Sequence, residues 1–323
     1  MLFGTTSVEA AKRITPAIFP PHSDNAAGIE LGYGIADVAG AALYQSGAYH
    51  HLHIKQILSV ARQRAWTSAD LATDEMKKAA DALFGAPVGA YGTLARSSAG
   101  WRMTMTVFRG NRTAPVEVNL PSDAAQAVQL GGNAVAAAIA SFDTTELADS
   151  KVHPRSRSGA AMSAYLSCYG VLVRQPMGLR ESRVVEVAKL ATARKDCEEA
   201  VKLDPGFVDA WAALSLASSL SLENERAAEA LKQTRGSNAY IPLAILSEYW
   251  LTTRFESHTA GANVLRKGLA TFPGALILRS YLGEHLNITR EYQEALDVWN
   301  RYLGAVGRSP YALSQKAYSM ARL

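Results

Sequence analysis

The sequence predicts an α+β part followed by an all-α part: a mixed-sheet α/β sandwich domain over residues 1–145, then an α-solenoid of about four helix pairs over residues 158–323. In the first half, helical periodicity gives way to period-2 alternation and then returns. In the second half, one small residue recurs every 34 residues, at Ala193, Ala227, Gly261 and Ala295. A chain of 323 residues is also long enough for about two domains.

The amino-terminal half predicts the element order β-α-β-α-α-β-β-β-α. Between residues 101 and 108, bulky apolar residues alternate with mostly polar ones, which is typical of a half-buried strand. Ser122 is a plausible N-cap for the last helix. The expected strands are 13–21, 48–54, 88–95, 101–108 and 116–120, and the expected helices are 28–47, 54–64, 69–84 and 122–142. This order favours a mixed sheet with helices packed on it.

In the carboxy-terminal half each small residue is followed, four positions later, by a bulkier apolar one. These positions hold Cys197, Leu231, Leu265 and Trp299. A spacing of four places both residues on one helix face, where the small one admits a close helix crossing and the bulky one fills the seam. Helices are expected at 160–173 and 184–203, a linker at 144–159, a loop at 176–181, and further units from Pro205, Ala239 and Pro273.

A second signature accompanies this period. Trp211 and Leu214, and later Leu282–Gly283, occupy the places of a W-x2-L-G motif, and Pro205 and Pro273 occupy the place of a closing proline. With these residues the carboxy-terminal half resembles tetratricopeptide (TPR) proteins, whose helix–turn–helix units stack into a right-handed solenoid. On this resemblance Trp211 and Trp299 are expected to be structural.

The amino-terminal half carries a second resemblance, in AIFPP, LGYGIADVAGAALYQSG and GAPVGAYGTLARSSAGWRMTMTVFRG. These segments resemble the amino-terminal domain of TolB and related FlgO-like domains of bacteria. In CadC-like and HilA-like bacterial regulators, and in some cyclases and kinases, such a module precedes TPR repeats. The resemblance implies a segment of a larger bacterial regulatory or envelope protein, with its output domain outside this chain.

Composition disfavours several classes of function. A net charge of +4 with scattered lysines and arginines argues against nucleic-acid binding by this segment. No run of about 18 apolar residues predicts a membrane span, and the amino terminus lacks the pattern of a signal peptide. The chain stops where a capping helix is expected, so we expect a segment of a longer protein. That protein would be cytoplasmic, or periplasmic if it carries a signal or an anchor.

No catalytic motif is present, and we expect no enzyme activity, metal or cofactor. His50, His51 and His53 invite a metal interpretation, but without carboxylates or cysteines at ligand spacing they are expected to be surface histidines. Gly28, Gly32 and Gly34 do not match a nucleotide-binding loop and are expected to permit close helix–sheet packing.

The TPR resemblance also implies a partner site, because the first helices of such repeats line a concave groove. An aromatic residue among polar groups, here Trp250, suits peptide recognition. The alternative is that Trp250 packs against the α/β domain or against the next turn of the solenoid. The predicted groove residues are Asp209, Leu216, Ser219, Leu243, Trp250, Arg254, Ser280, Glu284 and Asn287. The sequence thus favours a non-enzymatic scaffold or sensor for a protein or peptide partner; the alternative is a transcription-factor module that senses a small molecule in the crevice at the strand ends.

Aligned on the repeat, Cys168 takes the small position of the first helix, facing Ala193, one turn before Cys197. Both cysteines are expected to be buried neighbours across a helix pair. The interaxial distance permits a disulfide without requiring one. A reducing compartment would keep both thiols, and the periplasm would allow the bridge.

Overall fold

The structure is a computed structural model and describes residues 13–142, 147, 156–175, 187–237 and 241–323. Most of the predicted linker at 144–159 and the predicted loop at 176–181 lie outside these residues. So do the first residues of the helix predicted from Val184 and the start of the repeat predicted from Ala239.

The sheet has four strands in the order β1-β2-β3-β4. They are β1 (Pro16–Ile18), β2 (Val88–Ser97), β3 (Gly100–Arg109) and β4 (Arg112–Pro121). The short edge strand β1 pairs with β2 in parallel, and β2, β3 and β4 form an antiparallel meander. The predicted mixed sheet is confirmed. Pro16 is accommodated because an edge strand leaves one row of backbone groups unpaired.

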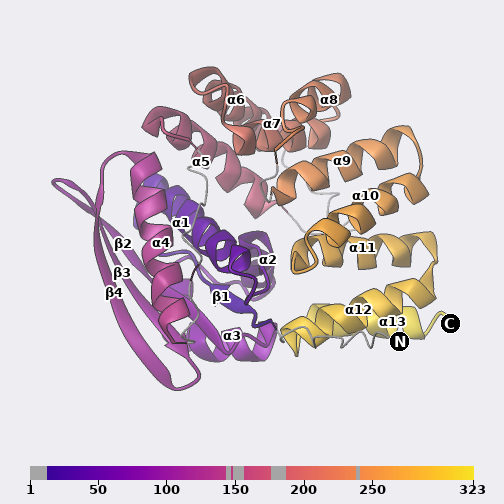
Figure 1. The fold of residues 1–323 in the computed structure, drawn as a ribbon, viewed down its shortest axis with the longest axis horizontal. Coiled ribbons are helices and arrows are strands. Elements are labelled where there is room, and N and C mark those ends of the chain that lie inside the picture. Colours follow the sequence, from indigo (N-terminus) through magenta and orange to yellow (C-terminus); the bar gives the residue numbers. More distant parts are fainter. Residues whose placement is uncertain (1–12, 143–146, 148–155, 176–186, 238–240) are drawn as a thin grey trace, which may run out of the picture.

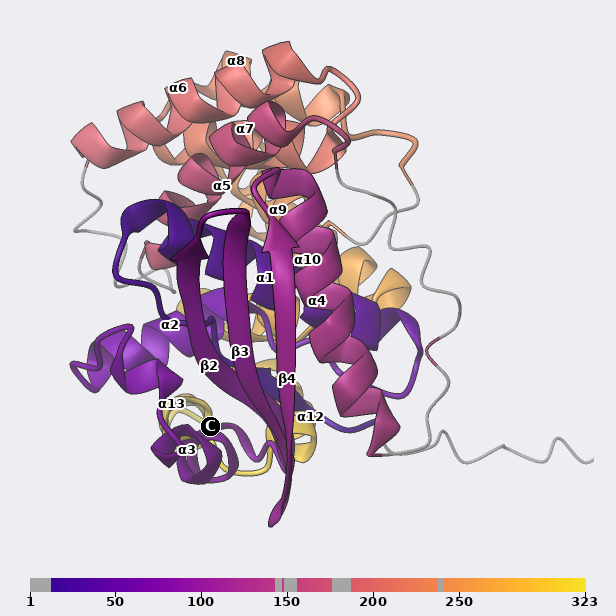
Figure 2. The same cartoon turned by 90° about the vertical axis from the view of Figure 1, so that its left-hand side faces the viewer.

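The α/β part also contains α1 (Ala26–Gln45), α2 (Ile54–Gln63), α3 (Glu75–Phe84) and α4 (Ala124–Ser141), with a 3-10 turn, η1, at Asp70–Ala72. Helices α1 and α4 cover one face of the sheet, behind it in Figure 2. Helix α1 is long and apolar enough to cross a membrane, but 78% of its most apolar window is buried within the fold. Its composition is therefore explained by a central position between the sheet and the helices beyond.

Three local predictions are corrected. No strand forms at 48–54, because Tyr49 bridges Ile14 whereas His51 bridges Ala275, so no ladder continues along one partner. The N-cap of α4 is Asp123, whose carboxylate accepts from Gln126 N at 2.9 Å, and not Ser122. The helix predicted at 69–84 is divided into η1 and α3.

The second part is a helical array in which consecutive helices pack against one another. Its helices are α5 (Gly159–Arg174), α6 (Val187–Leu203), α7 (Val208–Leu220), α8 (Asn224–Lys232), α9 (Pro242–Phe255), α10 (His258–Thr271), α11 (Leu276–Thr289), α12 (Tyr292–Val306) and α13 (Pro310–Met320). An α+β part followed by an all-α part is thus observed, as predicted.

The small positions of the 34-residue period lie in the helix packing. Ala193, Ala227 and Ala295 have no exposed surface. Trp299 is also fully buried, and its ring lies so close to Gly283 that a Cβ there would be 2.5 Å from a ring atom. Glycine is therefore required at Gly283 by the neighbouring indole, which explains the Leu-Gly pair noticed in the sequence.

The helical array curves around the α/β part on the side of α1 and α2, and the sheet lies on the far side (Figure 1). Backbone and side-chain hydrogen bonds join the two parts at several places. Thr15 Oγ1 donates to Ala305 O at 2.7 Å, and His51 N donates to Gly274 O at 3.0 Å. Lys55 Nζ donates to the carbonyls of Leu172 and Gln175, both at 2.9 Å. The buried apolar residues of both parts form one continuous core.

Candidate functional site

Most of the predicted groove residues lie in the interior. Leu216, Ser219, Leu243, Ser280, Glu284 and Asn287 are each at most 6% exposed. Only Asp209, Trp250 and Arg254 keep substantial exposed surface. The concave face that the sequence assigned to a peptide is thus largely unavailable in the folded chain.

Neighbouring helices and the α/β part account for this burial. Tyr311 Oη donates to the carboxylate of Glu284, and Ser319 Oγ donates to Asn287 Oδ1 at 2.6 Å, so α11 and α13 satisfy each other's polar groups. Gln56 of α2 donates to Tyr302 Oη at 2.9 Å, which brings the α/β part onto the array. Burial of its phenol raises the pKa of Tyr302, so this hydroxyl stays neutral.

Trp250 and Arg254 lie one turn apart on α9, as predicted, but they differ in their contacts. Trp250 is half-buried and packs against the core. Arg254 donates to the carbonyl of Ser219 and to the side chain of Asn224, which ties α9 to the turn between α7 and α8. Arg254 is therefore a structural link as well as a surface cation.

Four helices of the array carry a large exposed apolar residue at or just beyond their carboxyl ends. Among the described residues, Leu222, Phe255, Ile288 and Met320 are 38–68% exposed; Leu222 follows α7, and the other three lie in the last turns of α9, α11 and α13. Successive members of this helix set contact one another, so these ends share one edge, on the right in Figure 1 for α9, α11 and α13. We call these four residues the apolar edge.

Leu222 in the apolar edge is unusual in both its exposure and its backbone conformation. It is 68% exposed and has a φ of 66°, in the left-handed region that a leucine rarely adopts. Arg290, two periods later, has a φ of 67° at the equivalent turn. The left-handed turn thus occurs at two positions 68 residues apart but not at Glu256 midway between them, where φ is -110°, and at the first position it presents a leucine to solvent.

Of the three histidines predicted to be on the surface, His51 and His53 are in fact buried, and His50 is half-buried. His51 is 2% and His53 is 1% exposed, because the segment that carries them lies between the two parts. His53 Nδ1 accepts from Lys55 N at 3.1 Å and caps α2, so the ring proton lies on Nε2, 3.7 Å from Asp37 Oδ1 and 3.4 Å from Tyr169 Oη. No group of three potential metal ligands occurs in the part of the chain that the structure describes.

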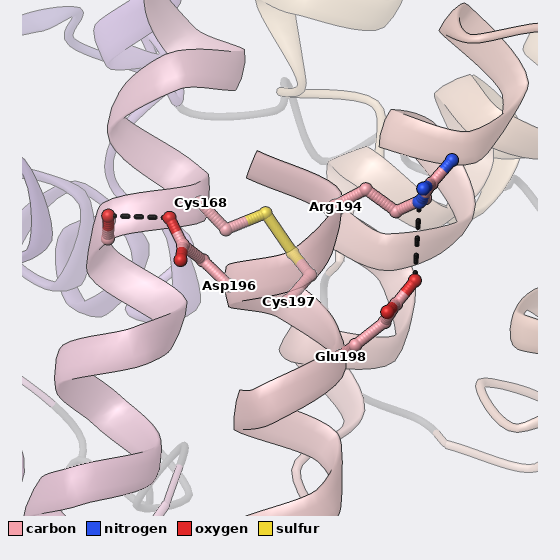
Figure 3. Close-up of a disulfide and its surroundings, with 6 residues drawn as sticks. Cys168, Arg194, Asp196, Cys197 and Glu198 are labelled. Carbon is pink, nitrogen blue, oxygen red and sulfur yellow. Dashed lines mark hydrogen bonds and ion pairs between the residues drawn. A yellow bond between two sulfur atoms is a disulfide. The ribbon is translucent and has the colours of Figure 1, made fainter. Parts of the chain in front are cut away.

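The two cysteines form a disulfide across α5 and α6, with a Cα–Cα distance of 5.4 Å (Figure 3). Both are fully buried, so the predicted proximity and burial are confirmed. Beside the bridge, Ser167 Oγ donates to Asp196 Oδ2 at 2.8 Å, and Arg194 pairs with Glu198 at 3.3 Å on the other side. The bridge and the Ser167–Asp196 bond hold α5 against α6, whereas the Arg194–Glu198 pair lies within α6.

A pocket of about 270 Å³ opens beyond the carboxyl end of β1. Sequence reasoning located a crevice at the strand ends but named no residue in it. The pocket is mostly apolar, with aromatic walls and two guanidinium groups. Its lining comprises Pro20, Pro21, Ile29, Tyr33, Leu58, Ala61, Arg62, Trp66, Thr67, Ser68, Leu71 and Arg174. Arg174 comes from α5, so the pocket lies where the two parts meet; we call it the β1 pocket.

Comparisons with known proteins add no relative: no protein-family model matches this chain, and no curated protein matches it significantly.

Proposed function

We propose that this chain is a non-enzymatic interaction and sensor segment of a larger bacterial regulatory or envelope protein, in which TPR repeats bind a protein or peptide partner. The resemblances in the sequence support the family and the bacterial setting. The observation that carries the partner site is the apolar edge beside Trp250 and Arg254. Isolated exposed leucines are common, but a row on successive helix ends suits a contact surface. The partner is expected on this edge, because most of the predicted residues of the concave face are buried by other parts of the chain.

The disulfide bears on the compartment. Buried structural disulfides form and persist in oxidising environments such as the periplasm. The Cys168–Cys197 bridge therefore supports the envelope alternative over the cytoplasmic one.

Site-specific photo-crosslinking in the native bacterium tests the partner site. A photoreactive amino acid at Phe255 should give a discrete adduct with one protein. The same group at Leu130, an exposed leucine of α4 in the other part, is the matched control and should give none. Phe255→Ser should then weaken binding of the identified protein by about 2 kcal/mol, as for an aromatic anchor. Equal labelling from both positions would refute the proposal.

A second candidate function is small-molecule sensing, which the β1 pocket favours. The pocket lies at the end of a parallel strand and at the junction of the two parts, a common place for small-molecule sites. A ligand there would contact both parts at once and would bias any motion between them. Calorimetric titration with a panel of small aromatic compounds tests this function, and the absence of any pocket-dependent binding would refute it.

A further inference from the structure

We infer that the β1 pocket binds a small organic carboxylate with a planar apolar body, and that Arg62 and Arg174 hold its carboxylate group. The inference rests on the second candidate function and adds the chemical class of the ligand. It is carried by three features of the pocket: its charge, its walls and its position between α2 and α5.

The charge of the pocket favours an anion. Arg62 and Arg174 are the only side chains among its described lining residues that carry a charge at neutral pH, because the phenol of Tyr33 is neutral there and burial raises its pKa further. Arg62 donates to the backbone carbonyl of Arg174, and Arg174 Nε donates to the carbonyl of Gly170 at 2.8 Å. Each guanidinium has five N–H donors, so these bonds leave several donors for a ligand. Two planar guanidiniums on the wall of one pocket suit the paired oxygens of a carboxylate.

Neighbouring carboxylates do not cancel this charge. Asp24 pairs with His22 at 3.2 Å, and the Asp70 carboxylate accepts from the backbone N–H and the hydroxyl of Thr67. Glu30 interacts with Arg174 and offsets part of one positive charge, although burial raises the pKa of its carboxyl. None of these carboxylates is among the residues that line the pocket, so the two charged side chains on its wall, Arg62 and Arg174, are both cations.

The walls of the pocket favour a flat apolar body over a hydrated inorganic ion. The Tyr33 and Trp66 side chains contribute aromatic surface, and the remaining lining is mainly proline and aliphatic. Leu58 and Leu71 are 9% and 2% exposed, so the floor of the pocket is part of the core. Phosphate would leave these walls facing water, whereas a ring would cover them. At about 270 Å³, the pocket is at the small end of ligand sites, which limits the body to about one ring.

The position of the two arginines links the ligand to the contact between the two parts. Arg62 is on the last turn of α2, and Arg174 is the last residue of α5. A carboxylate that accepts from both guanidiniums would tie the array to the α/β part. Because such a ligand binds only the folded chain, it would also raise the unfolding temperature.

Benzoate is a suitable probe, with benzamide as its neutral isostere and inorganic phosphate as an anion without a ring. Isothermal titration calorimetry on the whole chain should detect benzoate binding and much weaker binding of both controls. Arg62→Gln and Arg174→Gln should each weaken benzoate binding about tenfold or more, the usual loss for a hydrogen bond to a charged group. Arg64→Gln, at the end of the same helix but outside the pocket lining, is the matched control and should bind as the wild type does.

Circular dichroism of each variant establishes whether the fold is retained. If Arg174→Gln unfolds, the benzoate affinity of Arg62→Gln is compared with that of Arg64→Gln, and this comparison decides the result. The inference is overturned if Arg62→Gln and Arg64→Gln lose benzoate affinity equally, or if benzamide binds as tightly as benzoate. It is also overturned if phosphate competes with the affinity of benzoate, or if benzoate does not bind. If benzamide binds as tightly as benzoate and Trp66→Leu abolishes its binding, the carboxylate assignment is wrong but small-molecule sensing in this pocket is retained. Absence of binding by every aromatic probe would remove both.

Discussion

At the scale of single residues, the Cys168–Cys197 bridge has the clearest energetic consequence. It closes a loop of 29 residues and joins two helices whose connection is longer than the usual short turn. Cross-linking a loop of this length is expected to stabilise the folded chain by about 3 kcal/mol, mainly by restricting the unfolded ensemble.

Replacing both cysteines by alanine should therefore lower the free energy of unfolding by about 3 kcal/mol. Alanine is chosen because serine would bury hydroxyl groups in an apolar site. Chemical denaturation with and without a reductant measures the effect. Reductant should destabilise the wild type and leave the double variant unchanged; a wild type indifferent to reductant would show that the bridge carries no stability.

His50 gives a pH dependence. Desolvation, together with the positive charges of Arg279 and Arg13, lowers the pKa of His50 from 6.5 to about 4. Between these two values the unfolded chain binds a proton that the folded chain does not, so stability rises with pH. The contribution is complete above about pH 6.5 and is lost as the pH falls towards 4.

Since His50 is only half-buried, solvent screening reduces this contribution to about 1 kcal/mol. Denaturation midpoints measured from pH 4 to 7 should show the slope, and His50→Gln should flatten it by that amount. If the slope is the same in wild type and variant, another group carries it; His285, whose pKa is lowered mainly by burial, would then be next to test.

At the scale of elements, the 34-residue period is a packing rule that places a small side chain where two helices cross. Ala227 of α8 has no exposed surface, and its carbonyl accepts from Ser215 Oγ of α7 at 2.7 Å. The adjacent Ala228 is exposed. One helix thus presents the same residue type to the crossing and to solvent.

Ala227→Leu should destabilise the chain by about 1–3 kcal/mol, because extra methylenes at a packed crossing force the helices apart. Ala228→Leu is the matched control and should change stability by less than about 0.5 kcal/mol. Thermal melts followed by circular dichroism compare the two variants. Similar melting temperatures would mean that the small positions of the period do not mark the crossings.

At the scale of the whole molecule, Gly85 lies at a close contact between the two parts. It follows α3 with a φ of 55°, and a Cβ at this position would lie 1.8 Å from the carbonyl oxygen of Val306 at the end of α12. Gly110 has the same φ of 55° with nothing within 4 Å of its Cβ position. The two glycines share one left-handed backbone conformation and differ only in their neighbours.

Gly110→Ala should therefore cost about 1 kcal/mol, the left-handed penalty alone. Gly85→Ala should cost about 3 kcal/mol or more, since it must also displace the backbone of α12. Chemical denaturation measures both, and limited proteolysis shows whether the two parts separate. Equal losses would indicate that the array does not rest on the α/β part at this point.

The features that could be predicted from the sequence are those that depend on nearby residues. Alternation at residues 101–108 specifies β3, because side chains of a strand point to opposite faces. The 34-residue spacing identified the buried helix positions, and the repeat alignment placed Cys168 beside Cys197. In each case the signal is a period set by local backbone geometry.

Tertiary structure alone decided the surfaces. Glu284 and Asn287 have the spacing of groove residues, and His51 has the composition of a surface residue, yet all three are buried. The β1 pocket joins Arg62 to Arg174 across more than one hundred residues of sequence. These outcomes depend on how the helical array meets the α/β part. Such contacts are long-range and not periodic, so no local pattern in the chain encodes which faces they cover.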